Sequence, residues 1–383
     1  MIRRRKFHHS RRFIVLLGLL SVIPNVTRGE DSPAASATES TESKRREIVE
    51  SGLAYLAKEG QDDKGMFSSR VGPGVTALAV TAALKNGRSR DDAMVAKGLQ
   101  ALESFVHPDG GIYGNGRLRN YETCVAMVAF SEANSDGKYN ELLAKAKDFV
   151  TGVQYGQAER DPSDPWYGGA SYGGNGRPDL SNTGYLIEAL HSMETSSSDP
   201  AIQAALAFVS RSQNLKSEHN DTQFADKIDD GGFYYEIPTE KIDPSTSAER
   251  YSPNGGLRSY GSMSYTGLKS MIYAGLTSSD PRVKAAIQWV SDHYDVTSNP
   301  GMGSAGLYYY YNTFAVALDV TGMKTVQDAD GNSHDWRKDL VSELAKRQND
   351  DGSWSNTNNR WFENDKNLAT SFALLALSHA ASK

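Results

Sequence analysis

The sequence predicts an all-α protein, an α/α toroid of six helical hairpins in which about twelve helices form two concentric rings. Six segments share one order: a helix with one apolar stripe, a turn with glycine and an aromatic residue, a loop, and a helix that is apolar on most of its surface. Fully apolar helices belong inside a protein and striped helices belong outside, so the alternation predicts two layers. The last hairpin is as apolar as the middle ones, which favours a closed ring over an open superhelix of helical hairpins.

The C-terminal hairpin shows the repeat most clearly. In "LVSELAKRQNDDGSW", Leu340, Leu344 and Gln348 lie at i, i+4 and i+8, which is the spacing of one helix face. Gly352 then allows the chain to turn, and Trp354 can fill the gap between neighbouring hairpins. The apolar helix follows in "NLATSFALLALSHA".

Two residue types mark the repeat in every hairpin. A threonine stands near the start of each apolar helix: Thr76, Thr123, Thr183, Thr266, Thr313 and Thr370. A glycine in each turn is expected to supply a positive φ: Gly65, Gly111, Gly168, Gly232, Gly306 and Gly352.

The chain divides into three parts. Residues 1–29 have a basic head and the short apolar run "FIVLLGLLSVI", the layout of a signal peptide for Sec or twin-arginine export to the periplasm or the extracellular space. An uncleaved membrane anchor is the alternative. Residues 30–45, rich in Ser, Thr, Ala and Glu, are expected to be a disordered linker. Residues 46–383 form the toroid, with an insertion at about 233–259.

Charge and cysteine content narrow the functional classes. Residues 1–29 hold seven basic residues and no acid, so their removal takes the net charge from −6 to −13. Such an acidic chain without a basic cluster is not expected to bind nucleic acid. The single cysteine, Cys124, excludes an internal disulfide and a thiolate metal cluster. The histidines show no zinc-ligand spacing, and neither a metal nor a cofactor is expected.

These features resemble the prenyltransferase and squalene-cyclase repeat superfamily, whose toroids carry a "QW" motif. The motif consists of an aliphatic helix, a glutamine, a short spacer, a glycine, one residue and a tryptophan; "LVSELAKRQNDDGSW" fits it, and the segments around Gln213 and Gln154 fit it loosely. The resemblance covers residues 47–381. It implies a terpenoid-cyclase-like toroid whose substrate cavity lies on the axis, lined by the starts of the apolar helices.

The acid of the terpenoid cyclases is missing from its expected place. Those enzymes carry D-x-D-D followed by T to protonate an alkene, which needs an unusually strong carboxylic acid. The residues that precede the six threonines are Val75, Glu122, Asn182, Tyr265, Asn312 and Ala369. Glu122 is the one acid among them. The acids of "DKIDDGG" (226–232) are expected to be turn residues, like Asp350 and Asp351.

The candidate site therefore consists of polar and aromatic residues near the helix starts. Glu122 and Asp179 are the candidate catalytic acids. The candidate substrate-binding residues are Tyr121, Asn182, Tyr260, Tyr265, Tyr309, Asn312 and Asn367. Aromatic faces can stabilise a carbocation or stack on sugar rings. Alternatively, the tyrosines fill gaps between helices with their hydroxyls bonded to backbone, and Glu122 pairs with an arginine or caps its helix.

Three functions fit this pattern. The first is an exported cyclase or mutase of the isomerase type that binds or cyclises a polyprenyl substrate with a divergent acid. The second is a carbohydrate-active toroid, a lyase or hydrolase of polysaccharide. The third is a non-catalytic scaffold that binds a ligand or protein. The expected partner is accordingly a small lipid-like molecule or a polysaccharide, and the oligomeric state stays open.

Other motifs favour structural interpretations. "GASYG" contains Ser171 in a G-x-S-x-G pattern but follows no strand, which argues against a nucleophile. "GMGSAG" lacks a βαβ context and is expected to be a turn. "DADGNSHD" (328–335) could offer oxygens to calcium from Asp328, Asp330 and Asn332, but it lacks the EF-hand glycine, which favours a solvated loop.

Overall fold

The computed structural model describes residues 33–156, 161–174, 176–241 and 243–381. The outer helices are α1 (Pro33–Tyr55), α3 (Ala93–Glu103), α5 (Asn140–Gly152), α7 (Pro200–Arg211), α9 (Pro281–Asp292) and α11 (Trp336–Arg347). The inner helices are α2 (Gly74–Lys85), α4 (Arg119–Glu132), α6 (Leu180–Ser192), α8 (Gly261–Tyr273), α10 (Leu307–Val320) and α12 (Lys366–His379). A small antiparallel hairpin, β1 (Val326–Gln327) and β2 (Ser333–His334), precedes α11. The all-α class is confirmed.

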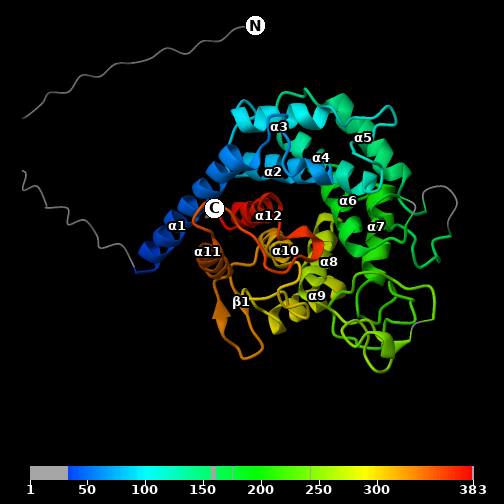
Figure 1. Cartoon of the computed structure of the whole chain (residues 1–383). Coiled ribbons are helices and arrows are strands. Elements are labelled where there is room, and N and C mark those ends of the chain that lie inside the picture. The colour runs from blue at the N-terminus through cyan, green and yellow to red at the C-terminus, as the bar shows by residue number, and fades with distance from the viewer. Residues whose placement is uncertain (1–32, 157–160, 175, 242, 382–383) are drawn as a thin grey trace, which may run out of the picture.

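The inner helices form a closed ring. Each packs against the next inner helix along the chain, and α12 packs against α2, so the last hairpin joins the first. The outer helices lie around this ring, and α1 closes the outer layer against α11 (Figure 1). The inner helices are buried over most of their length, whereas α3, α5, α7, α9 and α11 bury one face, as the apolar patterns predict.

Turn glycines let neighbouring hairpins approach closely. In five hairpins a glycine has φ between +79° and +88°, and a Cβ there would lie within 2.6 Å of a backbone carbonyl oxygen of the next outer helix: Gly65, Gly110, Gly168, Gly231 and Gly352. The predicted Gly111 and Gly232 are each one residue too late, because the first glycine of each Gly-Gly pair makes the turn. Any side chain at these turns would push the outer helices apart.

Glutamine side chains form hydrogen bonds across the same contacts between neighbouring hairpins. The Nε2 of each donates to the carbonyl of a turn glycine and to a carbonyl of the next outer helix: Gln61, Gln154, Gln213 and Gln348. The repeat pattern described above did not include Gln61, although "QDDKG" has the same glutamine–glycine spacing as "QNDDG". The glutamine of the QW-like motif therefore binds one hairpin to the next.

The inner-helix hydroxyls fix the loop that precedes each helix. In four hairpins a threonine Oγ1 accepts a hydrogen bond from a backbone N–H of that loop: Thr76, Thr123, Thr183 and Thr370. In the α8 hairpin Ser264 accepts from the Phe233 N–H instead, so the predicted Thr266 is two residues too late. Thr313 bonds to a carbonyl of its own helix. A serine hydroxyl can replace threonine here because the hydroxyl makes the contact.

Replacing Gln348 with alanine is expected to destabilise the ring by about 2 kcal/mol, because two hydrogen bonds are lost at about 1 kcal/mol each. Gln348 bonds to Gly352 at 2.9 Å and to Ile48 of α1 at 2.9 Å, across the junction between the last and first hairpins. Urea unfolding measures the loss. Gln288→Ala is the control, since Gln288 is exposed and bonds within α9. An equal loss in both variants would contradict the role of Gln348 at the junction.

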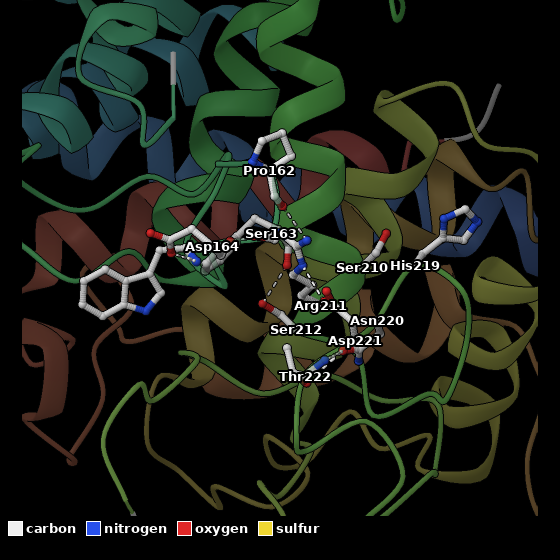
Figure 2. A network of polar contacts seen from close by, with 12 residues as sticks. Pro162, Ser163, Asp164, Ser210, Arg211, Ser212, His219, Asn220, Asp221 and Thr222 are labelled. Atoms are coloured by element: carbon white, nitrogen blue, oxygen red, sulfur yellow. Dashed lines mark hydrogen bonds and ion pairs between the residues drawn. The ribbon is translucent and has the colours of Figure 1, made fainter. Parts of the chain in front are cut away.

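The irregular segment between α7 and α8 is longer than the predicted insertion, 233–259, and begins at the end of α7. Four of its side chains form a small hydrophobic cluster with Phe208 of α7: Phe224, Tyr234, Ile237 and Leu257. The buried Arg211 connects it to the loop before α6 (Figure 2). Its guanidinium donates to Asp221 at 3.0 Å and to the carbonyls of Asp164 and Pro162 at 3.2 and 2.7 Å.

Replacing Arg211 with alanine is expected to lower the local stability of this segment by about 2 kcal/mol, because charge-assisted hydrogen bonds are lost on both loops. Limited proteolysis should then cut between residues 214 and 259 faster than in the parent protein. Lys216→Ala is the control, because Lys216 is exposed and its ion pair with Asp226 is loose at 3.6 Å. Unchanged cleavage in the Arg211 variant would show that the segment is held by its hydrophobic cluster alone.

The structure describes only part of the N-terminal segment for which predictions were made. The expected signal peptide, residues 1–29, lies outside the described residues. Residues 33–45, expected as linker, instead form the beginning of α1. Pro33 suits the first position of a helix, and Arg45 pairs with Glu42 at 2.9 Å and bonds to the Leu377 carbonyl of α12. Within the described chain, every helix is too short or too polar to cross a membrane.

Candidate functional site

A cavity of about 950 Å³ opens at the N-terminal ends of the inner helices. All six inner helices or their caps contribute to its lining. Nine of the lining residues are aromatic: Tyr121, Tyr172, Tyr185, Tyr235, Tyr260, Tyr309, Trp361, Phe362 and Phe372. Five carry acidic or basic side chains: Arg70, Glu122, Glu363, Asp365 and Lys366. The volume is that of a site for a drug-sized or larger ligand.

An aromatic row crosses the ring beneath this opening. Tyr172, Tyr121, Tyr185, Tyr309 and Phe372 follow one another with centroid separations of 6.0, 5.1, 6.1 and 5.7 Å. The four last residues come from α4, α6, α10 and α12, so the row ties together helices from both sides of the axis. These separations are typical of favourable aromatic pairs. The row gives the cavity a rigid wall of ring faces and edges.

Glu122 is a buried carboxyl group on the cavity wall. It lies in the first turn of α4 and is 3% exposed. Oε2 accepts a hydrogen bond from the Gly114 N–H at 2.9 Å, while no described residue donates to Oε1. Within the described chain, Glu122 forms no ion pair and does not cap its own helix, in contrast to the alternatives weighed above. Burial raises the pKa of Glu122, and the Gly114 hydrogen bond offsets part of that rise.

Two further carboxyl groups on the lining were not predicted, and both hold helix starts. Glu363 is 1% exposed and accepts hydrogen bonds from the Tyr309 N–H of α10 and from Asn356 Nδ2, both at 2.8 Å. Burial raises its pKa although these hydrogen bonds oppose the rise. Asp365 caps α12 through the Leu368 N–H and accepts from the Ser68 hydroxyl. The segment "NDK" before "NLATS" is a typical capping sequence that could have revealed Asp365.

Asp179, the second predicted catalytic acid, caps α6 and lies behind the lining. Its Oδ1 accepts from the Asn182 N–H at 2.8 Å and its Oδ2 from Asn182 Nδ2 at 2.7 Å. The Tyr235 hydroxyl, which belongs to a lining residue, also hydrogen bonds to it. Burial raises the pKa of Asp179 to about 6 against these hydrogen bonds. Asp179 therefore reaches the cavity through Tyr235.

The structure divides the predicted substrate-binding residues into two groups. Tyr121, Tyr260 and Tyr309 lie on the cavity lining. The others are not among the lining residues: Asn182, Tyr265, Asn312 and Asn367. Asn182 binds Asp179, and Asn367 bonds to the Gly60 carbonyl and the Ser68 hydroxyl.

In the run Tyr308–Tyr311, one tyrosine faces the cavity and three are structural. The Tyr309 hydroxyl contacts Ser181 Oγ at 2.9 Å and Thr266 Oγ1 at 3.2 Å. The other three hydroxyls donate to backbone carbonyls: Tyr308, Tyr310 and Tyr311. A helix turns by about 100° per residue, so consecutive side chains cannot share one face. Sequence alone could not decide which of the four lies inward.

Trp361 and Phe362 stand on the lining in an unusual backbone conformation. Their φ angles are 56° and 63°, in the left-handed region that non-glycine residues avoid. Each such residue costs roughly 1–2 kcal/mol, so the fold must hold this pair in place. Both rings remain accessible, at 45% and 64% exposure.

The other motifs have structural roles. Ser171 is 2% exposed, and its hydroxyl accepts from the Gly174 N–H, so it is not presented as a nucleophile. Asp230 and Asp351 accept from N–H groups of their turns, as predicted. Asp328, in the segment 328–335 that was expected to be a solvated loop, is engaged by Asn332 and His334. Within the described residues, no group of three or more His, Cys, Asp or Glu side chains could hold a metal ion.

Comparison with known proteins supports the fold and does not select one family. The chain matches no protein-family model and no curated protein. Among solved structures it is similar to a glycosidase, with a TM-score of 0.52 and 11% identity over 92% of this chain and 99% of that one. It is also similar to a polysaccharide lyase, with a TM-score of 0.49 and 11% identity over 88% of this chain and 97% of that one.

A type II terpene cyclase from Scytonema is a more distant match, with a TM-score of 0.35 and 11% identity over 90% of this chain and 99% of that one. At this identity the likenesses concern the fold alone. The glycosidase, with its TM-score of 0.52, agrees with the predicted α/α toroid. The narrower resemblance to the squalene-cyclase repeat proteins has no sequence match behind it.

Proposed function

We propose that this protein cleaves a glycosidic bond of a saccharide bound in the axial cavity, with Glu122 as the proton donor. The observation that carries the proposal is Glu122 itself, a buried carboxyl group on the wall of an aromatic cavity. Among the described residues it forms no ion pair, and none donates a hydrogen bond to its Oε1. The export expected from the N-terminal sequence would bring such an enzyme to extracytoplasmic polysaccharide.

The pKa of Glu122 favours this chemistry over alkene protonation. Burial raises the pKa, so the carboxyl group keeps its proton at higher pH but is a weaker acid. General acids work best when their pKa lies near the operating pH, and glycosidic oxygens are protonated by carboxylic acids tuned upward in this way. Protonation of an alkene needs a stronger acid than a surface glutamate, whereas burial makes Glu122 a weaker acid than a surface glutamate.

In the proposed step the Glu122 O–H donates its proton to the glycosidic oxygen as the bond from that oxygen to carbon breaks. Hydrolysis then adds water to the carbon and passes a water proton to a second carboxylate, for which the lining offers Asp365 and Glu363. Elimination instead passes the proton of the neighbouring ring carbon to that second carboxylate and leaves a carbon–carbon double bond. Both routes use the same proton donor, and their products differ.

The polyprenyl substrate is the second candidate, because nine aromatic side chains line the cavity and could stabilise a carbocation. The saccharide is preferred to the polyprene because the raised pKa of Glu122 suits protonation of a glycosidic oxygen better than protonation of an alkene. The tyrosine hydroxyls and the charged lining groups also suit a ligand rich in hydroxyl groups. The solved structure with a similar fold is named a glycosidase, which is the same class of enzyme, but this similarity is evidence for the fold alone.

The test is to incubate the protein, without residues 1–29, with neutral and uronic-acid polysaccharides and separately with squalene-type polyprenes. Mass spectrometry of the products should show shortened saccharides, with added water for hydrolysis or an unsaturated end for elimination. Cyclised polyprene with intact saccharide would establish the second candidate. Binding without turnover of either class would make the toroid a non-catalytic scaffold.

A further inference from the structure

We propose that Trp361 and Phe362 form a stacking platform for sugar rings at the mouth of the axial cavity. This inference rests on the proposed function, because it assigns a subsite to the same saccharide. In the described chain four large hydrophobic side chains are exposed: Val106, Tyr172, Trp361 and Phe362. Three of these four line the cavity, so the exposed apolar surface gathers at its opening. Such surface at a cavity mouth marks a place for a ligand.

The platform is held rigidly by its neighbours. The Glu363 carboxylate accepts from the Tyr309 N–H and from Asn356 Nδ2, both at 2.8 Å. The Glu363 carbonyl accepts from the Asn356 N–H at 2.8 Å, and the Phe362 carbonyl accepts from the Asp365 N–H at 2.8 Å. The bond from the Tyr309 N–H fixes the chain on one side of the aromatic pair to the start of α10, and the other bonds hold the loop to itself. The left-handed backbone of the pair is thus imposed by its surroundings, as is common at binding sites.

The two rings have different supports. The Trp361 ring packs where Gly306 has no side chain, since a Cβ there would lie 3.0 Å from the ring. The Arg360 guanidinium lies 4.3 Å from the centre of the Trp361 ring and helps to orient it. Phe362 is 64% exposed and presents the larger free surface. A pre-positioned ring loses little entropy when a ligand stacks on it.

The composition of this segment favours a sugar over a lipid. In "NTNNRWFEN" (356–364) the aromatic pair stands among asparagines, and Asn364 also lines the cavity. A sugar ring has one face of C–H groups and an edge of hydroxyls, so it is recognised by an aromatic face together with amide groups. A lipid surface would instead require a continuous apolar patch, with few amide groups to desolvate.

The platform is tested by binding rather than turnover, in protein that carries Glu122→Gln so that a bound saccharide is not consumed. The probes are cello-, xylo- and mannohexaose, an oligogalacturonate, and phosphatidylcholine–phosphatidylglycerol vesicles, and calorimetry measures Kd. Adding Trp361→Ala with Phe362→Ala should weaken the binding of the best saccharide at least tenfold, since each lost stacking contact is worth a severalfold change. Trp361→Tyr with Phe362→Tyr should keep most of the affinity, because both rings remain.

Two single variants complete the design. Val106→Ala, also an exposed apolar residue but not on the lining, should leave the saccharide Kd unchanged. Phe362→Gly removes one ring and relaxes a left-handed residue, so it should fold at least as well as the parent while binding saccharide more weakly. It serves as the second test if the double alanine variant unfolds.

The outcomes separate the platform from the proposed chemistry. Saccharide binding that is unchanged in the double alanine and Phe362→Gly variants overturns the platform and leaves the proposed function standing. Weakened binding with no cleavage by the parent supports the platform and overturns the proposed cleavage. Binding of vesicles alone, lost when the rings are removed, identifies a membrane contact and overturns the platform. No saccharide binding and no cleavage overturns both.

Discussion

Replacing Glu122 with glutamine is expected to lower kcat for saccharide cleavage by about a thousandfold, since general acid catalysis by one positioned group contributes roughly 10²–10⁴. Glutamine keeps the size of the side chain and can still accept from the Gly114 N–H, but it has no proton of suitable acidity to donate. KM should change little, because the carboxyl group acts mainly in the transition state. Steady-state kinetics on the substrate identified by product analysis provide the measurement.

Glu103→Gln is the matched control, because Glu103 pairs with Lys138 on the surface and should retain full activity. If Glu122 is the proton donor, the parent protein should also lose activity as pH rises through the pKa of Glu122, which burial raises above the ordinary value of glutamate. In the glutamine variant this basic limb of the pH profile should disappear from any residual activity. Full turnover by the Glu122 variant would remove this residue from the mechanism.

The same substitution should stabilise the folded protein at neutral pH. The pKa of Glu122 is higher in the folded than in the unfolded chain, so the folded state binds its proton more tightly. Glu122 therefore favours the folded state at low pH. It destabilises the folded state as pH rises from the pKa that Glu122 has in the unfolded chain through the pKa that it has in the folded chain. The melting temperature of the glutamine variant should therefore exceed that of the parent by more at pH 7 than at pH 4. An equal difference at both pH values would contradict the raised pKa.

Replacing Gly72 with alanine is expected to have the second largest effect, with a stability loss of about 2 kcal/mol or more and a fall in kcat of at least tenfold. Gly72 has φ of 91°, and an alanine Cβ would lie 2.2 Å from Glu122 Oε1. Either the loop or the carboxyl group must move, so the proton donor loses its position. Chemical unfolding and kinetics on the same preparation measure both effects.

Gly87→Ala separates backbone strain from the collision with Glu122. Gly87 has φ of 89°, and a Cβ there meets no atom within 4 Å, so its alanine variant carries strain alone. It should lose about 1 kcal/mol of stability and keep its kcat. If the Gly72 variant also kept full kcat, the position of Glu122 would not depend on the Gly72 loop.

The repeat made the fold predictable from sequence. The apolar stripes, the glutamine–glycine spacing and the hydroxyl near the inner-helix start recur because most hairpins make the same contacts. The predicted residue was wrong where a contact between hairpins depends on a chemical group that more than one residue can supply. Ser264 makes the hydrogen bond to the loop that was expected of Thr266, and the first glycine of each Gly-Gly pair, rather than the second, makes the turn. The helix at residues 33–45 was missed because its local composition resembles that of a linker.

The candidate site was predictable only near the threonines. Glu122 could be singled out because it directly precedes Thr123 in the repeat. Glu363 and Asp365 were missed because they lie in the loop between α11 and α12, at no fixed spacing from a repeat residue. Trp361 and Phe362 belong to the same loop, and nothing in their sequence signals a left-handed backbone or exposed rings.

The sequence by itself determined the hairpin unit, the two layers and the end of the toroid at which side chains can meet, because short-range periodicity sets which faces are apolar. The tertiary structure alone decided which of four consecutive tyrosines faces the axis, and that Glu122 forms no ion pair with a described residue while Asp179 caps a helix. Burial and pairing depend on residues far apart in the chain. The acidity of a carboxyl group, and hence its chemistry, is therefore set by the closed ring rather than by its neighbours in sequence.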